Sequence, residues 1–279
     1  MTKFRDEVPV PDLSIIIVSY NARADLERCL ASLQHPAPAV SHEIIVVDNA
    51  SSDGSADAAR RSPAVRVIES GANRGFAAAN NMGIRASAGA HVLLLNSDTV
   101  APAGAIDGLM RELLRHPDAA VVGPRLVDAE GRAELSFGRM ISPLNELRQK
   151  RLVRGHARRK PGMSRRVEDM TRHEQWPDWV SGACLLVRRH DAEAVGLLDE
   201  RFFMYTEDVD FCAAIRARGG RILFTPAIEI VHIRGRSAAS APAATRAAYR
   251  RSQLAFYQKH HPGLAPLVRL YTRFFPQGR

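Results

Sequence analysis

The sequence has only three cysteines, Cys29, Cys184 and Cys212, and they lie far apart. None of them forms a Cys-x-x-Cys pair, which argues against a disulfide framework and against a structural zinc site. No apolar run approaches the roughly 18 residues that span a bilayer, and residues 1–7 contain no apolar signal core. We therefore expect a cytosolic protein, and leave open a peripheral association with the inner membrane.

Two glycine signatures of nucleotide-binding enzymes are also missing. No Gly-x-Gly-x-x-Gly follows the first predicted strand, and no Gly-x-x-x-x-Gly-Lys-Ser/Thr occurs in the chain. These absences disfavour a dinucleotide dehydrogenase and a P-loop enzyme. A nucleotide bound by this protein would have to be held by side chains.

The sequence has a strong excess of positive charge, with a formal net charge of +9 over 279 residues. Ten cations fall between residues 148 and 172, against two acidic residues. Such a bias favours an anionic partner: nucleic acid, a membrane surface or a phosphorylated substrate. Aromatic residues make up only 6% and no DNA- or RNA-binding motif is present, so we expect no nucleic-acid partner.

Apolar runs at 13–18, 43–47, 65–68 and 92–95 alternate with helical patterns. This alternation predicts an α/β fold with a doubly wound, mostly parallel central sheet. It weakens after residue 120, where a hairpin predicts a small antiparallel portion. We expect one domain over residues 10–237 and a basic, aromatic helical C-terminal extension over 238–279.

The segment 143–177 has no clean periodicity, many cations and three prolines. We therefore predict a mobile basic loop there. In the C-terminal extension, residues 246–260 and 264–275 combine arginines with aromatic and leucine side chains. Such segments suit helices lying on an anionic membrane surface, and the alternative is that they pack onto the preceding domain.

Polar residues follow three of the predicted strands: Tyr20 and Asn21, then Asp48, then Asp98. Parallel strands bring their carboxyl ends to one edge of the sheet, where ligands bind in open α/β folds. Asp98 is a candidate to hold a divalent metal on a substrate phosphate. Taken alone, the triplet 96–98 could equally be turn chemistry and a helix cap.

Six short segments together resemble the family 2 glycosyltransferases, and in particular the bacterial rhamnosyltransferase-like branch. They are Ile-Ile-Ile-Val-Ser-Tyr-Asn (15–21), Val-Val-Asp-Asn-Ala-Ser-Ser-Asp-Gly-Ser (46–55), Asn-Arg-Gly-Phe-Ala-Ala-Ala-Asn-Asn (73–81), Leu-Leu-Asn-Ser-Asp (94–98), Trp-Val-Ser-Gly-Ala (179–183) and Tyr-Thr-Glu-Asp-Val-Asp (205–210). The resemblance implies the GT-A fold and an inverting transfer of sugar from a nucleoside diphosphate donor.

The resemblance also implies which residues bind the nucleotide: Ser19, Tyr20, Asn21, Asp48, Asn73, Gly75, Phe76, Asn80, Asn96 and Ser97. Asp48 stands where a carboxylate accepts the N3 hydrogen of uracil or thymine. Asp98 stands in the metal-binding Asp-x-Asp position, but Asn96 replaces its first carboxylate. Mg²⁺ or Mn²⁺ held by one carboxylate, the donor diphosphate and water remains reasonable. His232 matches a position that can supply a further ligand, with a structural histidine as the alternative.

An inverting transfer needs a carboxylate to take the acceptor proton. By resemblance Asp208 is this general base, Glu207 orients the acceptor or the base, and Trp179 and Gly182 fall in the acceptor region. The alternatives are that Glu207 and Asp208 cap a helix and that Trp179 is core.

We expect a pyrimidine donor, with dTDP-L-rhamnose ahead of UDP-sugars. The acceptor would be a saccharide or a polyprenyl-diphosphate-linked saccharide in cell-surface polysaccharide synthesis. One alternative function is a sugar-nucleotide nucleotidyltransferase, although the usual Gly-rich N-terminal signature of that class does not occur in this sequence. The other is a basic nucleic-acid-binding protein, which the net charge of +9 suggests.

Overall fold

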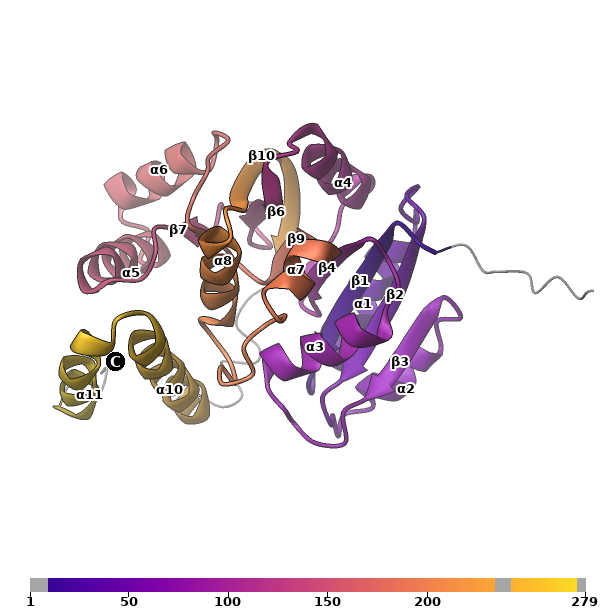
Figure 1. Cartoon of the computed structure of the whole chain (residues 1–279). Coiled ribbons are helices and arrows are strands. Elements are labelled where there is room, and N and C mark those ends of the chain that lie inside the picture. Colours follow the sequence, from indigo (N-terminus) through magenta and orange to yellow (C-terminus); the bar gives the residue numbers. More distant parts are fainter. Residues whose placement is uncertain (1–9, 234–241, 275–279) are drawn as a thin grey trace, which may run out of the picture.

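The first half of the chain alternates strands and helices, as its apolar runs predict. The computed structural model describes residues 10–233 and 242–274 (Figure 1). Four parallel strands lie in the order β3-β2-β1-β4. They are β1 (Leu13–Ser19), β2 (His42–Asp48), β3 (Val65–Glu69) and β4 (His91–Asn96), connected by α1 (Arg23–Gln34), α2 (Ser55–Arg60) and α3 (Phe76–Ala86).

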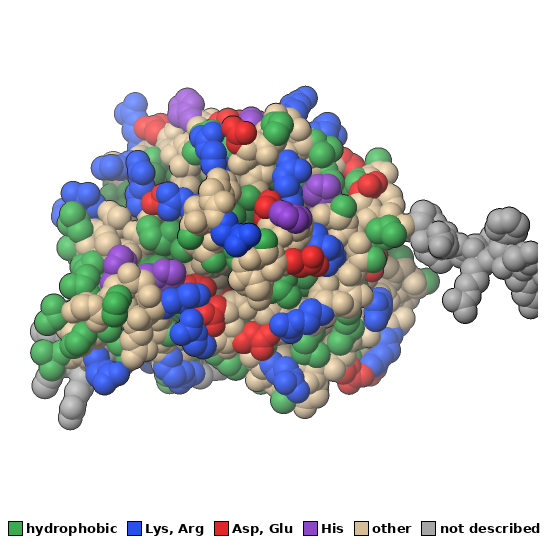
Figure 2. Space-filling view, in the orientation of Figure 1, with side chains coloured by type: hydrophobic (Ala, Val, Ile, Leu, Met, Phe, Trp, Pro, Cys, Tyr) green, Lys and Arg blue, Asp and Glu red, His purple; other side chains and the backbone are tan. Residues whose placement is uncertain are grey.

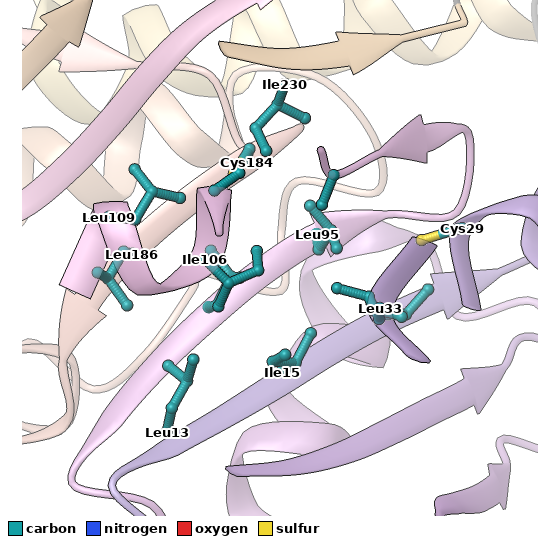
Figure 3. Close-up of a cluster of buried hydrophobic side chains, with 14 of the residues drawn as sticks. Leu13, Ile15, Cys29, Leu33, Leu95, Ile106, Leu109, Cys184, Leu186 and Ile230 are labelled. Atoms are coloured by element: carbon teal, nitrogen blue, oxygen red, sulfur yellow. The ribbon is translucent and has the colours of Figure 1, made fainter. Parts of the chain in front are cut away.

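The core lies on both faces of this sheet, because β1 and β4 are apolar at nearly every position. Leu13, Ile15 and Ile17 of β1 belong to one cluster with α1, and Ile16 belongs to a second cluster on the α3 face. Figure 3 shows side chains of the first cluster from β1, α1 and β4. Burying each such side chain contributes about 1.5–3 kcal/mol. The core therefore fixes the ends of β1 and β4.

The second half extends the sheet with strands of both directions. The full order is β3-β2-β1-β4-β9-β6-β10-β5, with β9 antiparallel to both of its neighbours. The additions are β5 (Thr99–Val100), α4 (Ala105–Arg115), β6 (Ala119–Val127), β9 (Cys184–Arg188) and β10 (Arg221–His232). A separate antiparallel pair joins β7 (Phe137–Gly138) to β8 (Trp179–Val180). The predicted α/β class and its small antiparallel portion are confirmed.

The prediction of a loop over 143–177 is wrong for most of that segment. It forms two helices, α5 (Pro143–Ala157) and α6 (Pro161–Met170). Each begins with its proline in the first turn, where a missing N–H costs nothing. The only buried residues are Gly155 in α5 and Val167 in α6, so the sequence carries little helical periodicity.

The remaining helices are α7 (Arg189–Ala194), α8 (Glu207–Ala217), α10 (Pro242–His260), the short 3₁₀ helix η1 (Pro262–Leu264) and α11 (Ala265–Phe274). In α10, Phe256 and Tyr257 are buried, and Lys259 and His260 contact Asp210 of α8. This helix packs on the catalytic domain, whereas α11 exposes Leu267 and Leu270. Within the described ranges, no helix is both long enough and apolar enough to cross a membrane. The expected boundary at 237/238 lies outside the described residues.

Candidate active site

The candidate site lies at the edge of the sheet where its topology reverses. From β1 the chain adds β2 and β3 on one side and then β4 on the other, so the carboxyl end of β1 is a switch point. The register places Ser19 beside Asp48 and Val18 beside Asn96. Three predicted nucleotide-binding residues therefore meet at one edge.

Asp48 has one carboxylate oxygen in use and one without a partner. Its Oδ2 accepts the backbone N–H of Ser51 at 2.9 Å, whereas Oδ1 is buried with no hydrogen-bond partner among the described residues. The Ser19 hydroxyl, beside it in the register, is in the same condition. An unpaired buried acceptor is costly, and an N–H group of a bound ligand would satisfy it.

Asn21 and Tyr20 lie on the loop after β1. Asn21 joins two loops, because its Oδ1 accepts the backbone N–H of Ser52 at 2.8 Å and its own N–H donates to Ser51 at 3.0 Å. Its φ of 49° is the left-handed conformation that asparagine tolerates. Tyr20 is 46% exposed beside it. The structure thus supports the turn role of Asn21 and leaves the Tyr20 ring accessible.

The loop before α3 is organised by a residue absent from the predicted set, Asn49. Its amide donates to Asn73 Oδ1 at 3.0 Å and to the carbonyl of Gly75 at 3.3 Å, and its own oxygen accepts the N–H of Arg74 at 2.9 Å. Asn49 is 3% exposed. Its place directly after a buried strand was the available signal.

Gly75 is needed where α3 begins against Phe203. Its φ is +83°, and a Cβ there would lie 2.3 Å from the Phe203 carbonyl oxygen. The same oxygen accepts the N–H of Phe76 at 2.7 Å. Asn80 is buried in α3, where its amide donates to the Phe76 carbonyl at 2.9 Å and stabilises the first turn.

A short strand pairing brings the two predicted metal ligands together. β5 pairs with the end of β10, with Thr99 opposite His232. As a result Asp98 Oδ1 lies 3.3 Å from Nε2 of His232, and Glu134 Oε2 lies 3.1 Å from its Nδ1. Asn96 ends β4, and Ser97 and Asp98 form the turn that precedes this pairing.

The contacts of His232 suit a metal ligand. Burial acts to lower its pKa, but the contacts with Asp98 and Glu134 outweigh burial and raise the pKa to about 9. A histidine ligand commonly donates its second ring N–H to a carboxylate, which directs the other nitrogen to the metal. Glu134 is placed to do this, and no local pattern in the sequence pointed to it. Asp98 and His232 therefore fit a divalent cation at this edge.

Asp208 lies in the first turn of α8 and is held by two backbone amides. Its Oδ2 accepts the N–H of Gly182 at 2.9 Å, and its Oδ1 accepts the N–H of Val209 at 2.8 Å. Burial raises the pKa of Asp208 above its usual range, although these hydrogen bonds oppose the shift. The preceding residues, Tyr205 and Thr206, have φ of 70° and 64°. Such strain costs about 1–3 kcal/mol per residue and is typical of functional sites.

Glu207 is more deeply buried than its neighbour. It is 6% exposed, and its Oε2 has no hydrogen-bond partner among the described residues. Burial, together with the negative charge of Asp208, holds the pKa of Glu207 well above its usual range. Glu207 therefore keeps its proton to a higher pH than an ordinary glutamate, and in its protonated form it can donate a hydrogen bond.

Asp208 opens onto a cavity of about 250 Å³, which we call the acceptor pocket after the role predicted from the sequence for Trp179 and Asp208. Trp179, Ser181 and Tyr205 line it, and Tyr249 of α10 contributes a further part of the wall. The Trp179 indole donates to the Arg139 carbonyl at 2.9 Å, which fixes the ring. The predicted Trp179 and Asp208 are thus brought together. Tyr249 was not predicted as a site residue, because nothing local in the sequence connects it to Asp208.

The profile of the family described as "Glycosyl transferase family 2" matches residues 14–171, more than half of the 279 residues. The chain is a family 2 glycosyltransferase. The matched part includes the strand ends with Asp48 and Asp98, and it ends before the acceptor pocket's Trp179 and Asp208.

This glycosyltransferase is rhamnosyltransferase-like in sequence. It is 34% identical over 272 residues to the N-acetylglucosaminyl-diphospho-decaprenol L-rhamnosyltransferase of Mycobacterium tuberculosis, covering 90% of this chain and 85% of that protein. It is 28% identical over 225 residues to the low-salt glycan biosynthesis hexosyltransferase Agl10 of Haloferax volcanii, covering 79% and 67%.

Solved structures establish the fold of this glycosyltransferase as GT-A. A mannosyltransferase from Pyrobaculum calidifontis, in complex with GDP-Man and Mn²⁺, superposes with a TM-score of 0.61 at 19% identity, covering 94% of this chain and 69% of that one. GalNAc-T7 with UDP, GalNAc and Mn²⁺ superposes with a TM-score of 0.59 at 17% identity, covering 82% and 45%.

Proposed function

We propose that the protein transfers a sugar, with rhamnose favoured, from a pyrimidine nucleoside diphosphate to a hydroxyl of a lipid-linked saccharide, inverting the anomeric centre. The observation that carries the proposal is the Asp208 carboxylate, held by Gly182 on the wall of the acceptor pocket. The mycobacterial relative, named as a rhamnosyltransferase acting on a diphospho-decaprenol-linked sugar, supports the substrate class.

In the proposed reaction Asp208 takes the proton of the acceptor hydroxyl while the oxygen of that hydroxyl bonds to the anomeric carbon of the donor sugar. The bond from that carbon to the donor diphosphate breaks on the opposite face, and the nucleoside diphosphate leaves with the electron pair. Mn²⁺ or Mg²⁺ at Asp98 and His232 would stabilise the negative charge of the leaving group. An imidazole ligand suits Mn²⁺ better than the harder Mg²⁺.

The donor base would lie at Asp48. Uracil and thymine both carry an N3 hydrogen, and Asp48 Oδ1 is a buried acceptor without a partner among the described residues. Tyr20 would cover the base or ribose from the exposed side. In this proposal the enzyme works peripherally on the inner membrane, where a lipid-linked acceptor would be found.

The test is transfer by the purified protein from a panel of dTDP-L-rhamnose, UDP-sugars and GDP-mannose to a prenyl-diphospho-N-acetylglucosamine. We expect a disaccharide of inverted configuration by NMR, with a pyrimidine donor preferred. Transfer from GDP-mannose alone would contradict the assignment of Asp48. Pyrophosphate release from a nucleoside triphosphate and a sugar 1-phosphate, without disaccharide, would favour a nucleotidyltransferase instead.

A further inference from the structure

A second, larger cavity lies next to the acceptor pocket, between β7, α5, α6 and residues 174–177. Its volume is about 900 Å³, and we call it the basic cavity. Its lining includes the four arginines Arg139, Arg148, Arg151 and Arg166, with Glu174 as its one acidic residue. Figure 2 shows Lys and Arg side chains over the α5 and α6 region of the molecule.

The four arginines of the basic cavity lack protein partners. Among residues 10–233 and 242–274, none of their guanidinium groups forms an ion pair or a hydrogen bond, although many other arginines of the chain do. Grouping four like charges around one cavity is unfavourable unless an anion neutralises them. Guanidinium groups match phosphate oxygens in pairs, so the lining suits a ligand with more than one phosphate.

The basic cavity and the acceptor pocket share part of their walls. Arg139, Asn145 and Gln149 line both of them. A ligand with a sugar at Asp208 would therefore direct its next groups into the basic cavity. The donor diphosphate is assigned elsewhere, to the strand edge at Asp98 and His232.

Part of the lining of the basic cavity is apolar. Leu152 of α5, Met163 and Met170 of α6, and Trp176 line it. Methionine and leucine side chains adapt to flexible chains, and they offer contact to a hydrocarbon but none to a free anion. The lining thus changes from cationic to apolar within one cavity.

We propose that the basic cavity binds the diphosphate and the first prenyl units of the acceptor, an assignment that rests on the proposed function. Arg139 lies on the wall shared with the acceptor pocket, and it binds phosphate oxygens together with Arg148, Arg151 and Arg166. The methionines and Trp176 contact the hydrocarbon. The cavity thereby selects acceptors whose sugar is linked through a diphosphate.

The test is binding of farnesyl diphosphate, which carries no sugar, to the full chain by calorimetry. In the double variant Arg148→Gln/Arg151→Gln we expect binding to weaken about tenfold or more. The KM for a prenyl-diphospho-sugar acceptor should rise in parallel, with the KM for the donor unchanged. The matched control is Arg158→Gln/Arg165→Gln, which removes the same charge from the residue that follows α5 and from α6. Neither residue lines the cavity, so this variant should bind like wild type.

The outcomes separate this inference from the proposed function. Equal binding by wild type and both double variants would overturn the assignment, as would inorganic diphosphate binding as tightly as farnesyl diphosphate. Competition by anionic phospholipid vesicles as strong as that by farnesyl diphosphate would overturn it in favour of a membrane headgroup site. Selective loss of farnesyl diphosphate binding in a protein that transfers no sugar would support the cavity and contradict the reaction.

Discussion

The backbone N–H of Gly182 donates to Oδ2 of Asp208 at 2.9 Å, which joins the turn before β9 to the first turn of α8. This contact leaves each carboxylate oxygen a further lone pair toward the acceptor pocket. The space around it is limited, because a Cβ on Gly182 would lie 3.3 Å from the Phe76 ring and 3.4 Å from Asp208 Cβ. The Asp208 carboxylate is thus oriented by the backbone rather than by another side chain.

We predict that Asp208→Asn lowers kcat about 10²–10⁴-fold without loss of folding, because the amide oxygen can still accept the N–H of Gly182 but cannot take the acceptor proton. The measurement is transfer rate together with thermal unfolding. Asp118→Asn, at a side chain that is 75% exposed, is the control and should behave as wild type. Wild-type turnover by Asp208→Asn would remove Asp208 from its role.

The raised pKa of Glu207 leads to a prediction of how the free energy of unfolding depends on pH. Its pKa is raised in the folded protein, so above the unfolded value of about 4.5 the folded state keeps a proton that the unfolded state has lost. Its contribution to the free energy of unfolding therefore falls as pH rises, by up to about 1.4 kcal/mol per pH unit, until the folded pKa is passed. Glu207→Gln should flatten this decline in the pH range directly above 4.5, as measured by urea unfolding. An unchanged slope would show that Glu207 is ionised in the folded protein.

The contact between Asp98 and His232 predicts the metal dependence of donor binding. We expect Asp98→Asn or His232→Asn to abolish most of the gain in nucleoside diphosphate affinity that Mn²⁺ provides, and Glu134→Gln to reduce it about 10–100-fold. Calorimetric titration with and without Mn²⁺ measures this gain. His190→Asn, with a side chain 91% exposed, is the control. Equal enhancement in all variants would place the metal elsewhere.

We expect substitution by alanine to lower stability by different amounts at two glycines that have similar backbone angles. Gly71 and Gly75 have φ of +72° and +83°, but a Cβ on Gly71 meets nothing within 4 Å, whereas one on Gly75 meets the Phe203 carbonyl at 2.3 Å. Gly71→Ala should cost about 1 kcal/mol of stability, and Gly75→Ala about 3 kcal/mol or more. Denaturant unfolding compares them. Equal losses would mean that Phe203 can move away freely.

We expect Glu146 of α5 to stabilise α10 through its hydrogen bonds. Its carboxylate accepts from the Tyr249 hydroxyl at 3.1 Å, the Gln253 amide at 2.5 Å and the Tyr257 hydroxyl at 3.2 Å. Glu146→Ala leaves these donors unpaired, so we expect a loss of about 1–3 kcal/mol and faster amide exchange in α10. Glu193→Ala, on a 57% exposed side chain, is the control. Unchanged exchange in α10 would show that its apolar contacts suffice.

The sequence predicted those features that depend on residues close together in the chain. Apolar runs predicted β1 to β4, and the polar residues that follow them, Asp48 and Asp98, lie at the edge of the sheet as expected. Asp208 was found through a local motif, and the structure adds the amides that hold it. Their chemical roles remain proposals.

What could not be predicted depends on contacts between distant segments. Glu134 meets His232 across 98 residues, and Tyr249 reaches the acceptor pocket from a C-terminal helix, so neither leaves a local signal. Helix α5 was missed because it buries almost nothing. From the sequence, the aromatics of α10 suited a membrane or a protein surface equally. The buried Phe256 and Tyr257 and the ion pair of Lys259 with Asp210 show that they pack on the protein.

The position of β9 between β4 and β6 limits how this enzyme can be recombined with its relatives. Consider a chimera in which the chain after residue 171 comes from a relative. Its two parts would divide the strand ends that carry Asp48 and Asp98 from Trp179 and Asp208. Such a design would at first be expected to exchange acceptor specificity as one unit. However, β9 is in the later half and hydrogen-bonds to both β4 and β6 of the earlier half. Any exchanged half must therefore preserve the packing of Leu185, Leu186 and Val187 between those strands, and specificity is more readily altered by grafting α5, α6 and α10 onto an unchanged sheet.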